Sequence, residues 1–475
     1  MNTNTRKTQI KKISCLFLTL GLGISLACRL SSSATPQVVI PGLPPATEII
    51  PAEPGVLETS EIGEPTVEPT TQPTTAPPAL EWDYNWLHFG MDSQFSSYNP
   101  NETKITKENI ASLKRVWGAG CDDGLFSVYG GTPALYEGSI IVTHAGGKLE
   151  AGDAYTGEKD WDFGENAYGW APPPVVSTDG IVYYLYVTTD ASAKLYAVQA
   201  ETGQQIWEAG TQFKTGFNND TQVTVDEKND LVYILEDMFG DGSLYAVDRN
   251  TGEIQWSLGS KREKEGITFV GYIVLLKDDK LYVAAAVPGE IAKRLHMVRV
   301  DLLTQEVDLQ YDIPEELNLS WEVGWYGICN DHLFETYQDG SRNATVLVAH
   351  SLDQPGITWQ INVPAQSGRL ACDPQKDILY IPTGESLLAL DASTGTTVWE
   401  HKSIKSVFSP TIANGIIYYI SDTNLYALDQ EDGSQLFRFP LGTEGEESTG
   451  VAVNEGLVVF SGNGGTCDLY VLGLK

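Results

Sequence analysis

The sequence predicts an all-β protein, a β-propeller of eight four-stranded blades. Three observations support this prediction: a 13-residue pattern that recurs along most of the chain, a second hairpin upstream of each copy, and an incomplete blade at each end. Successive copies lie 38 to 53 residues apart. Periods of this size are typical of solenoids and propellers.

The recurring pattern is itself a β-hairpin. Its clearest copy, residues 244–256, contains a short alternating strand, an Asp-x-x-Thr-Gly turn and a second strand that ends in Trp. Glycine in the turn supplies the positive φ that other residues resist. Six further copies fit the same frame: residues 149–161, 195–207, 297–309, 347–359, 387–399 and 425–437.

A second hairpin precedes each copy, as in residues 410–420 and 451–460. Two hairpins per repeat make a four-stranded sheet, and such sheets arranged around an axis are propeller blades. The chain ends in a third strand, 469–473, with no fourth strand after it. We expect residues 113–117 to supply that strand, so that both termini build the closing blade and complete a ring of eight.

These repeats resemble those of the pyrroloquinoline-quinone-like (PQQ-like) propeller family, in which Ala is followed by Gly six residues on and Trp four further. The frame occurs at Ala246/Gly252/Trp256 and in three other copies, and the resemblance covers residues 82–475. In that family the Trp stacks on the Ala and Gly backbone of the motif and ties blades together. The resemblance thus implies structural roles for Trp117, Trp161, Trp207, Trp256, Trp359, Trp399, Gly157, Gly203, Gly252 and Gly395.

The N-terminal 81 residues are predicted to lie outside this fold. Residues 1–27 read as a secretion signal, with a basic start and an apolar stretch too short for a confident membrane span. Residues 25–28 (Ser-Leu-Ala-Cys) resemble a bacterial lipoprotein cleavage site, although the family pattern prefers Leu where Ser25 stands. Lipidation of Cys28 is the first interpretation, plain secretion the second and an uncleaved anchor the third, and the domain is expected to be extracytoplasmic.

Residues 28–81 are rich in Pro, Thr, Ser and Glu and predict a disordered stalk, because such a segment cannot bury enough apolar surface to fold. The remaining residues, 82–475, hold 25 basic and 56 acidic side chains, a net charge of −31. That charge argues against a nucleic-acid or anionic-lipid partner, which would need clustered Lys and Arg. It permits a basic partner, and it also serves solubility.

Four cysteines remain in the domain, and an even number in an exported protein favours disulfides. Cys121 and Cys467 flank the two strands of the closing blade and are expected to face each other, which would lock the termini together. Cys329 and Cys372 each end the first strand of adjacent blades and form a second predicted bridge. No Cys-x-x-Cys spacing indicates zinc.

The sequence contains no catalytic, cofactor-binding or metal-binding constellation: the six histidines are scattered and no nucleophile elbow occurs. Quinoprotein dehydrogenases of the resembling family use PQQ and calcium and carry two adjacent disulfide-linked cysteines, which this chain lacks. Trp321, Trp325 and Tyr326 lie outside the repeat frame on the first strand of a blade. They are candidates for lining the central channel, with core packing as the alternative.

Three functions from different classes follow. The first is a non-catalytic, monomeric surface lipoprotein that presents its loops to a protein partner in the cell envelope. In its repeat and lipid signal it resembles the propeller lipoprotein of the outer-membrane β-barrel assembly machinery, although the long stalk departs from it. The second is a glycan- or envelope-binding module, and the third a PQQ-dependent dehydrogenase.

Overall fold

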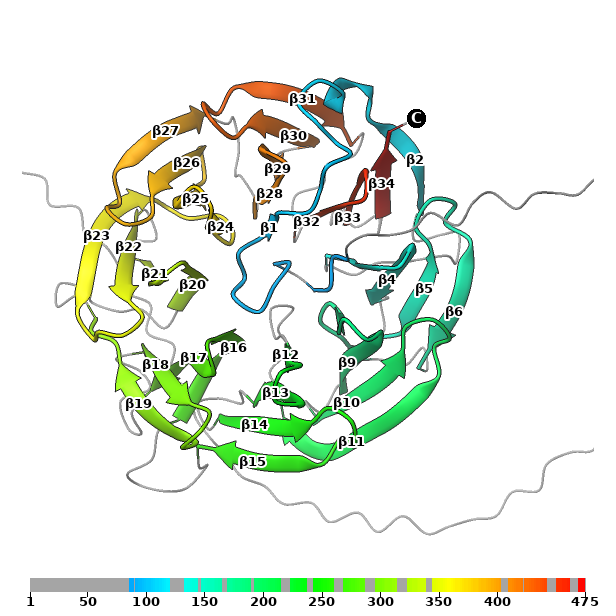
Figure 1. The fold of residues 1–475 in the computed structure, drawn as a ribbon, viewed down its shortest axis with the longest axis vertical. Helices are drawn as coiled ribbons and strands as arrows, with labels where there is room; N and C mark the ends of the chain where they lie inside the picture. Colours follow the sequence, from blue (N-terminus) through cyan, green and yellow to red (C-terminus); the bar gives the residue numbers. More distant parts are fainter. Residues whose placement is uncertain are drawn as a thin grey trace, which may run out of the picture. The chain divides into compact units, whose positions relative to one another are not determined.

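The computed structural model describes sixteen segments of the 475-residue chain: residues 85–88, 90–119, 132–143, 147–164, 169–188, 192–214, 223–236, 242–259, 268–286, 295–313, 323–338, 344–402, 409–421, 423–441, 450–461 and 469–474. They form eight sheets around a central axis (Figure 1), so the predicted eight-bladed propeller is confirmed. Within these segments, no helix combines the length and the apolar composition that crossing a membrane would require.

Blades one to four follow one another along the chain, each beginning at the axis. Blade one contains β3 (Ala134–Tyr136), β4 (Ser139–Thr143), β5 (Leu149–Asp153) and β6 (Lys159–Phe163). Blade two contains β7 (Gly169–Trp170), β8 (Val175–Val176), β9 (Ile181–Thr188), β10 (Ser192–Gln199) and β11 (Gln205–Lys214). Blade three contains β12 (Thr224–Asp226), β13 (Leu231–Glu236), β14 (Ser243–Asp248) and β15 (Ile254–Leu258). Blade four contains β16 (Thr268–Lys277), β17 (Lys280–Ala286), β18 (Leu295–Asp301) and β19 (Glu306–Gln310).

Blades five to seven repeat the arrangement. Blade five contains β20 (Val323–Cys329), β21 (His332–Gln338), β22 (Ala344–Ser351) and β23 (Ile357–Pro364). Blade six contains β24 (Ala371–Asp373), β25 (Ile378–Pro382), β26 (Ser386–Asp391) and β27 (Thr397–Lys402). Blade seven contains β28 (Thr411–Ala413), β29 (Ile416–Ser421), β30 (Asn424–Asp429) and β31 (Gln435–Pro440), to which β1 (Tyr98–Asn99) adds in parallel.

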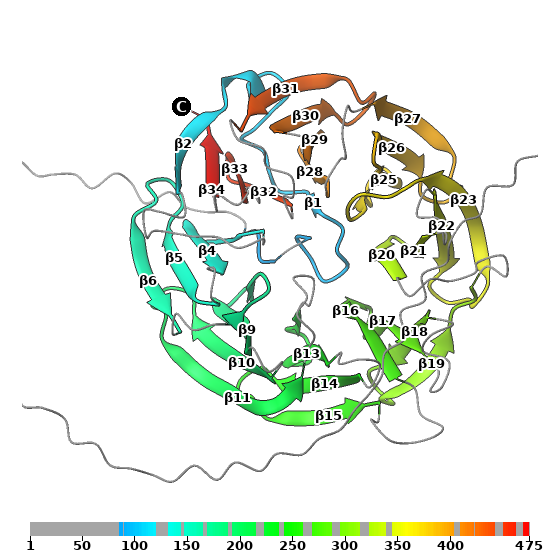
Figure 2. The same cartoon turned by 180° about the vertical axis from the view of Figure 1, so that it is seen from behind.

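Blade eight combines strands from both ends of the chain. β32 (Val451–Asn454), β33 (Leu457–Ser461) and β34 (Leu469–Gly473) come from the C-terminal part, and β2 (Lys114–Ala119) pairs with β34 as the outermost strand. The short 3-10 helix η1 (Ile110–Ser112) leads into β2. Figure 2 shows β2 beside β34 from the opposite side of the ring.

The repeated hairpin forms for the local reasons that its sequence suggests. In blade three the Asp248 carboxylate accepts hydrogen bonds from the backbone N–H groups of Asn250 and Thr251, both at 2.9 Å. Gly252 adopts φ +77° and donates its N–H to the Asp248 carbonyl, which closes the turn. Blade four keeps this turn geometry without glycine, because Gln305 takes φ +59° instead.

Strands near the axis are buried on both faces, whereas the outermost strand of each blade is buried on one face only. All six residues of β29 are buried, while β15 alternates half-buried and exposed positions. The apolar clusters lie between neighbouring blades; one combines Leu235 and Leu244 of blade three with Val283 and Val298 of blade four. Each sheet is therefore stabilised mainly by contact with the sheets on either side.

Tryptophan and glycine of the repeat meet across blade boundaries. The Trp161 indole of blade one donates its N–H to the Ala200 carbonyl in the turn of blade two, at 2.8 Å. A Cβ placed on Gly203 in that turn would lie 2.7 Å from the Trp161 ring, so only glycine allows the ring to stack there. The same contact recurs for Trp117 on Gly157, Trp207 on Gly252, Trp359 on Gly395 and Trp399 on Gly433.

Two boundaries flanking blade four depart from this arrangement. Trp256 of blade three faces a turn that has no glycine, and in blade four Leu309 stands at the Trp position. Across the second of these boundaries, the Arg299 guanidinium donates to the Leu352 carbonyl and to the Asp353 carboxylate of blade five, both at 2.9 Å. The Tyr311 hydroxyl donates to the same Leu352 carbonyl at 2.7 Å, so an ionic contact and a buried tyrosine together replace the tryptophan between blades four and five.

Candidate functional site

The segment that precedes the first blade lies across the axis of the ring. Figures 1 and 2 show this segment, residues 85–109 and hereafter the lead-in, passing in blue through the centre between β1 and blade one. It contacts one blade after another. Trp86 exchanges two backbone hydrogen bonds with Leu135 of blade one, and Leu87 accepts one from Val176 of blade two. The channel is consequently occupied by the protein's own backbone.

The lead-in forms similar hydrogen bonds with the following blades, each time at the equivalent position of the blade's first strand. The carbonyls of Ser93, Gln94, Ser96 and Ser97 accept the backbone N–H groups of Leu276, Ile328, Cys372 and Ile412, in blades four to seven, at 2.8–3.1 Å. In blade eight, the Asn99 side-chain amide donates to the Val453 carbonyl at 2.8 Å. Strand register makes these positions equivalent to one another and to Val225 of blade three.

A compact turn holds the middle of the lead-in in place. The Asp92 carboxylate accepts the backbone N–H groups of Gln94 and Ser96 and also the Ser96 hydroxyl. Gly90 has φ +82°, and its Cβ position would lie 2.8 Å from the Phe95 ring, so a larger residue would displace Phe95. Phe95 is 5% exposed and packs into the apolar cluster between blades four and five.

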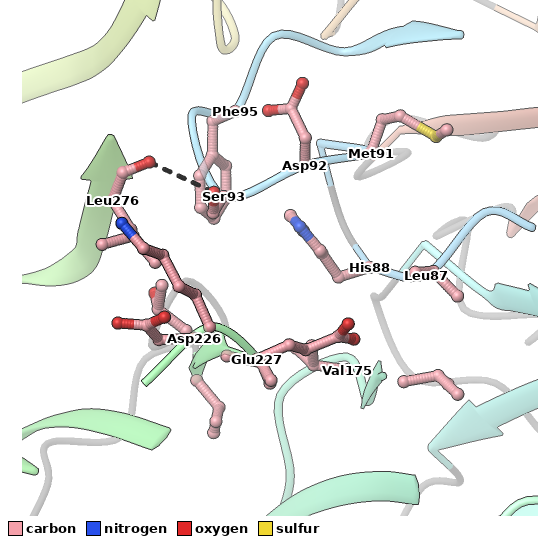
Figure 3. A pocket seen from close by; sticks show the side chains of 15 residues that line it. Leu87, His88, Met91, Asp92, Ser93, Phe95, Val175, Asp226, Glu227 and Leu276 are labelled. Carbon is pink, nitrogen blue, oxygen red and sulfur yellow. Dashed lines mark hydrogen bonds between the residues drawn. The ribbon is translucent and has the colours of Figure 1, made fainter. Parts of the chain in front are cut away.

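A cavity of about 340 Å³ lies between the lead-in and the second to fourth blades. In Figure 3, His88 and Asp92 of the lead-in approach it from one side and Asp226 and Glu227 of blade three from the other. Its lining is mainly aliphatic and aromatic, from Leu87, Met91, Phe95, Val175, Val176, Val223, Val225 and Leu276. The volume is near the lower end of the range of roughly 300–1,000 Å³ that small-ligand pockets occupy.

The charged groups around the cavity are held by protein partners. Asp226 is buried and accepts hydrogen bonds from the Asn229 amide and the Tyr233 hydroxyl, both at 2.9 Å. Burial and the Asp226 carboxylate both raise the pKa of Tyr233 above its ordinary range. Glu227 accepts the backbone N–H and hydroxyl of Thr178 in blade two.

Lys228 completes the rim through an ion pair with Asp279 of blade four, and this hydrogen bond raises the pKa of Lys228. These contacts join three blades around the cavity, and they leave its rim with more negative than positive charge. In the described segments, no group of three His, Cys, Asp or Glu side chains converges as a metal site would require.

The three residues expected to line the channel take different positions. Trp325 is half-buried on β20, and the Arg369 guanidinium stacks on its ring with 4.6 Å to the ring centroid. Arg369 also lies 5.4 Å from the centre of the Phe95 ring, so the two aromatic rings share one cation. Tyr326 follows the alternative of core packing: it is 7% exposed and packs among apolar side chains of blades four and five, because neighbouring residues of a strand point to opposite faces. Trp321 lies outside the described residues.

The predicted Cys329–Cys372 disulfide is present, with the two Cα atoms 5.9 Å apart. It joins blades five and six at the axis, beside the lead-in, because the Cys372 N–H donates to the Ser96 carbonyl. Cys28, Cys121 and Cys467 lie outside the described residues, so their lipidation and pairing stay predictions. Each of the last two is two residues beyond the paired residues Ala119 and Leu469.

Sequence reasoning did not find the cavity. Val225 and its neighbours in β12 read as an ordinary buried strand, and the lead-in contains no repeat from which its path could be inferred. Arg369 was missed for the same reason, since its aromatic partners Phe95 and Trp325 are 274 and 44 residues away in the chain. Only contacts across the assembled ring bring these residues together.

The family model described as outer membrane protein assembly factor BamB matches residues 101–236 and 342–468, more than half of the chain. The chain belongs to this family. Among curated proteins, none matches the sequence. Several solved structures also resemble this BamB-family propeller. At 14% sequence identity, their likeness to it is a likeness of fold.

Three of these structures show how widely the fold is shared. Quinohemoprotein alcohol dehydrogenase from Comamonas testosteroni has 14% sequence identity and a TM-score of 0.62, over 82% of this chain and 80% of that one. BamB from Moraxella catarrhalis also has 14% identity, with a TM-score of 0.54, over 76% of this chain and 98% of that one. The computationally designed Ika8 protein has the same TM-score of 0.54 at 14% identity, over 74% of this chain and 99% of that one.

Proposed function

We propose that this BamB-family protein is a non-catalytic, extracytoplasmic lipoprotein, anchored through Cys28, whose propeller is a scaffold for protein partners. The observation that supports this most strongly is the lead-in, which fills the axis of the ring with the chain's own backbone. The family's description as an assembly factor agrees with such a role. Enzyme chemistry has less support, because the carboxylates around the axial cavity are already engaged by Ser96, Tyr233 and Thr178.

The quinoprotein alternative makes a separate prediction about cofactor binding. The sequence has no adjacent cysteine pair, and its described disulfide instead joins residues 43 positions apart in two blades. If the scaffold proposal is correct, adding PQQ and calcium to the full chain leaves the melting temperature unchanged and produces no dye-linked oxidation of alcohols or sugars. Turnover that depends on PQQ would overturn the proposal.

Partner capture tests the scaffold directly. The full chain, crosslinked in cells and purified from envelope extracts, should retain the same protein partner in every preparation, whereas a polysaccharide array should show no retained glycan. Cys28→Ser should abolish incorporation of labelled palmitate and release the protein from the membrane fraction. Retention of a glycan without any protein would support the envelope-binding alternative and contradict the scaffold.

A further inference from the structure

Among the described residues, the lead-in makes a main-chain contact with seven blades and none with blade three. The equivalent residue of blade three is Val225, which the register pairs with Val232 of β13. Blades three and six have the same kind of turn here, with Asp226 and Asp373 accepting backbone N–H groups and Asp230 and Asp377 at φ +55° and +56°. Val225 therefore corresponds to Cys372, whose N–H points away from its own hairpin and donates to Ser96.

In this arrangement the lead-in does not pair with the backbone N–H and C=O of Val225. By this register its N–H and C=O point away from β13, and outside the strand ladder no backbone hydrogen bond reaches either group among the described residues. Val225 lines the 340 Å³ cavity, which lies between the lead-in and blade three. A backbone N–H and C=O that stay unpaired beside an apolar cavity are uncommon and favour an additional hydrogen-bonding partner.

The occupied blades show what kind of partner fits. At blade one, Trp86 forms an antiparallel bridge with Leu135, in which a single residue both donates and accepts, at 2.8 and 2.7 Å. At blade seven, Tyr98 and Asn99 add a short parallel strand. In each case the occupant is extended peptide backbone, which is how a free strand edge commonly recruits a ligand.

We propose that the cavity beside Val225 binds a short extended peptide of a protein partner. One peptide residue bridges to the Val225 N–H and C=O, and a neighbouring aliphatic side chain enters the space between Val176, Leu276 and Phe95. The peptide carries positive charge at its ends, because Asp92 and Glu227 lie at the rim and the chain as a whole has a net charge of −33. This inference rests on the scaffold function and names the place where the scaffold holds its partner.

Binding of a defined peptide to the full chain tests the site. The probe is acetyl-Lys-Val-Ile-Val-Lys-amide, and its control carries an N-methyl group on the central Ile, which removes the N–H that would meet the Val225 carbonyl. We expect saturable binding of the probe, weakened about tenfold or more by N-methylation, the effect of losing roughly one backbone hydrogen bond. Hydrogen exchange at the Val225 amide should slow when the probe is bound.

Substitutions in the protein give the matching comparison. Val225→Pro removes the backbone donor and should lower the affinity for the probe about tenfold. Val225→Thr keeps the donor and a branched side chain, so it should bind the probe as the unmodified protein does. Should Val225→Pro fail to fold, Leu276→Trp tests the same site by filling the cavity with the Val225 N–H intact. Unchanged affinity in the folded variants, or no binding to the unmodified protein, would overturn the proposal.

The outcomes separate this site from the scaffold function. If Val225→Pro still captures the protein partner and the unmodified protein does not bind the probe, the peptide site is wrong and the scaffold function is unaffected. If residues 29–81 of the same chain were the occupant, deleting them would raise the affinity for the probe about tenfold or more, and a partner peptide would be the wrong assignment.

Discussion

The boundaries between blades two and three and between blades four and five perform the same task with different chemistry. At the first, Trp207 stacks on Gly252 and donates its indole N–H to the Arg249 carbonyl at 2.9 Å. At the second, Leu309 replaces the tryptophan, and Arg299 reaches across to Leu352 and Asp353. The first boundary combines a buried indole with one hydrogen bond. The second combines the buried Tyr311, whose hydroxyl also donates to Leu352, with a guanidinium that binds Asp308 as well.

The difference between the two boundaries indicates which contacts between blades depend on the repeat motif. A tryptophan on a glycine needs one large side chain and one residue without Cβ, so both must be present for the contact to form. The ionic boundary is adaptable, because the guanidinium carries several donors and tolerates a turn of another sequence. The ring can therefore close although both boundaries of blade four lack the motif, and the cavity lies beside blades three and four.

The largest loss of stability is expected when a tryptophan that stacks on a glycine turn is removed. Trp207→Ala removes a ring that is 8% exposed and its hydrogen bond to Arg249, and should lower the free energy of unfolding by about 3–5 kcal/mol. Trp256→Ala is the matched control, because the Trp256 indole N–H donates to no residue in the described segments and faces no glycine. Chemical denaturation should show a clearly smaller loss for the control. Equal losses would mean that the glycine turn adds nothing to the tryptophan.

The next largest loss of stability is expected when the glycine of the turn is replaced. Gly395 has φ +71°, and its Cβ position lies 2.7 Å from Trp359, so Gly395→Ala combines backbone strain with a steric clash. We expect a loss of about 2–3 kcal/mol. Gln305→Gly, at the equivalent turn of blade four with φ +59°, should instead be neutral or stabilise by up to about 1 kcal/mol. Thermal denaturation of both variants measures this, and destabilisation by Gln305→Gly would show that its side chain has another role.

The repeat explains why the ring was predictable. Seven copies of one hairpin, most of them with Asp and most with Gly at fixed turn positions, define strand order and register locally. Adjacent blades place Cys329 near Cys372 for the same reason. No such pattern exists in the lead-in, whose path depends on contacts with seven blades up to 354 residues distant. The choice between channel lining and core packing for Tyr326 stayed open, because the sequence alone does not indicate which face of β20 points toward blade four.

The smallest expected effect concerns the ionic region of blade four and its dependence on pH. The Lys280 ammonium beside Asp301, with backbone N–H groups of the turn, lowers the pKa of Asp301 to about 2. The unfolded-state pKa of Asp is about 3.9, so the folded state favours the ionised carboxylate. Its stabilising contribution is complete above about pH 4 and is lost as the pH falls toward 2.

Asp301→Asn should consequently melt below the unmodified protein at pH 7, and the difference between the two melting temperatures should shrink as the pH falls below about 4. Lys280→Met provides the control, since removing the ammonium should reduce the effect of Asp301→Asn in the double variant. Added salt should weaken the Asp301–Lys280 contact while leaving the loss in Trp207→Ala unchanged, because an aromatic contact is not screened. A melting difference that is constant from pH 7 to pH 3 and insensitive to salt would mean that the ion pair of Asp301 and Lys280 adds nothing to the stability of blade four.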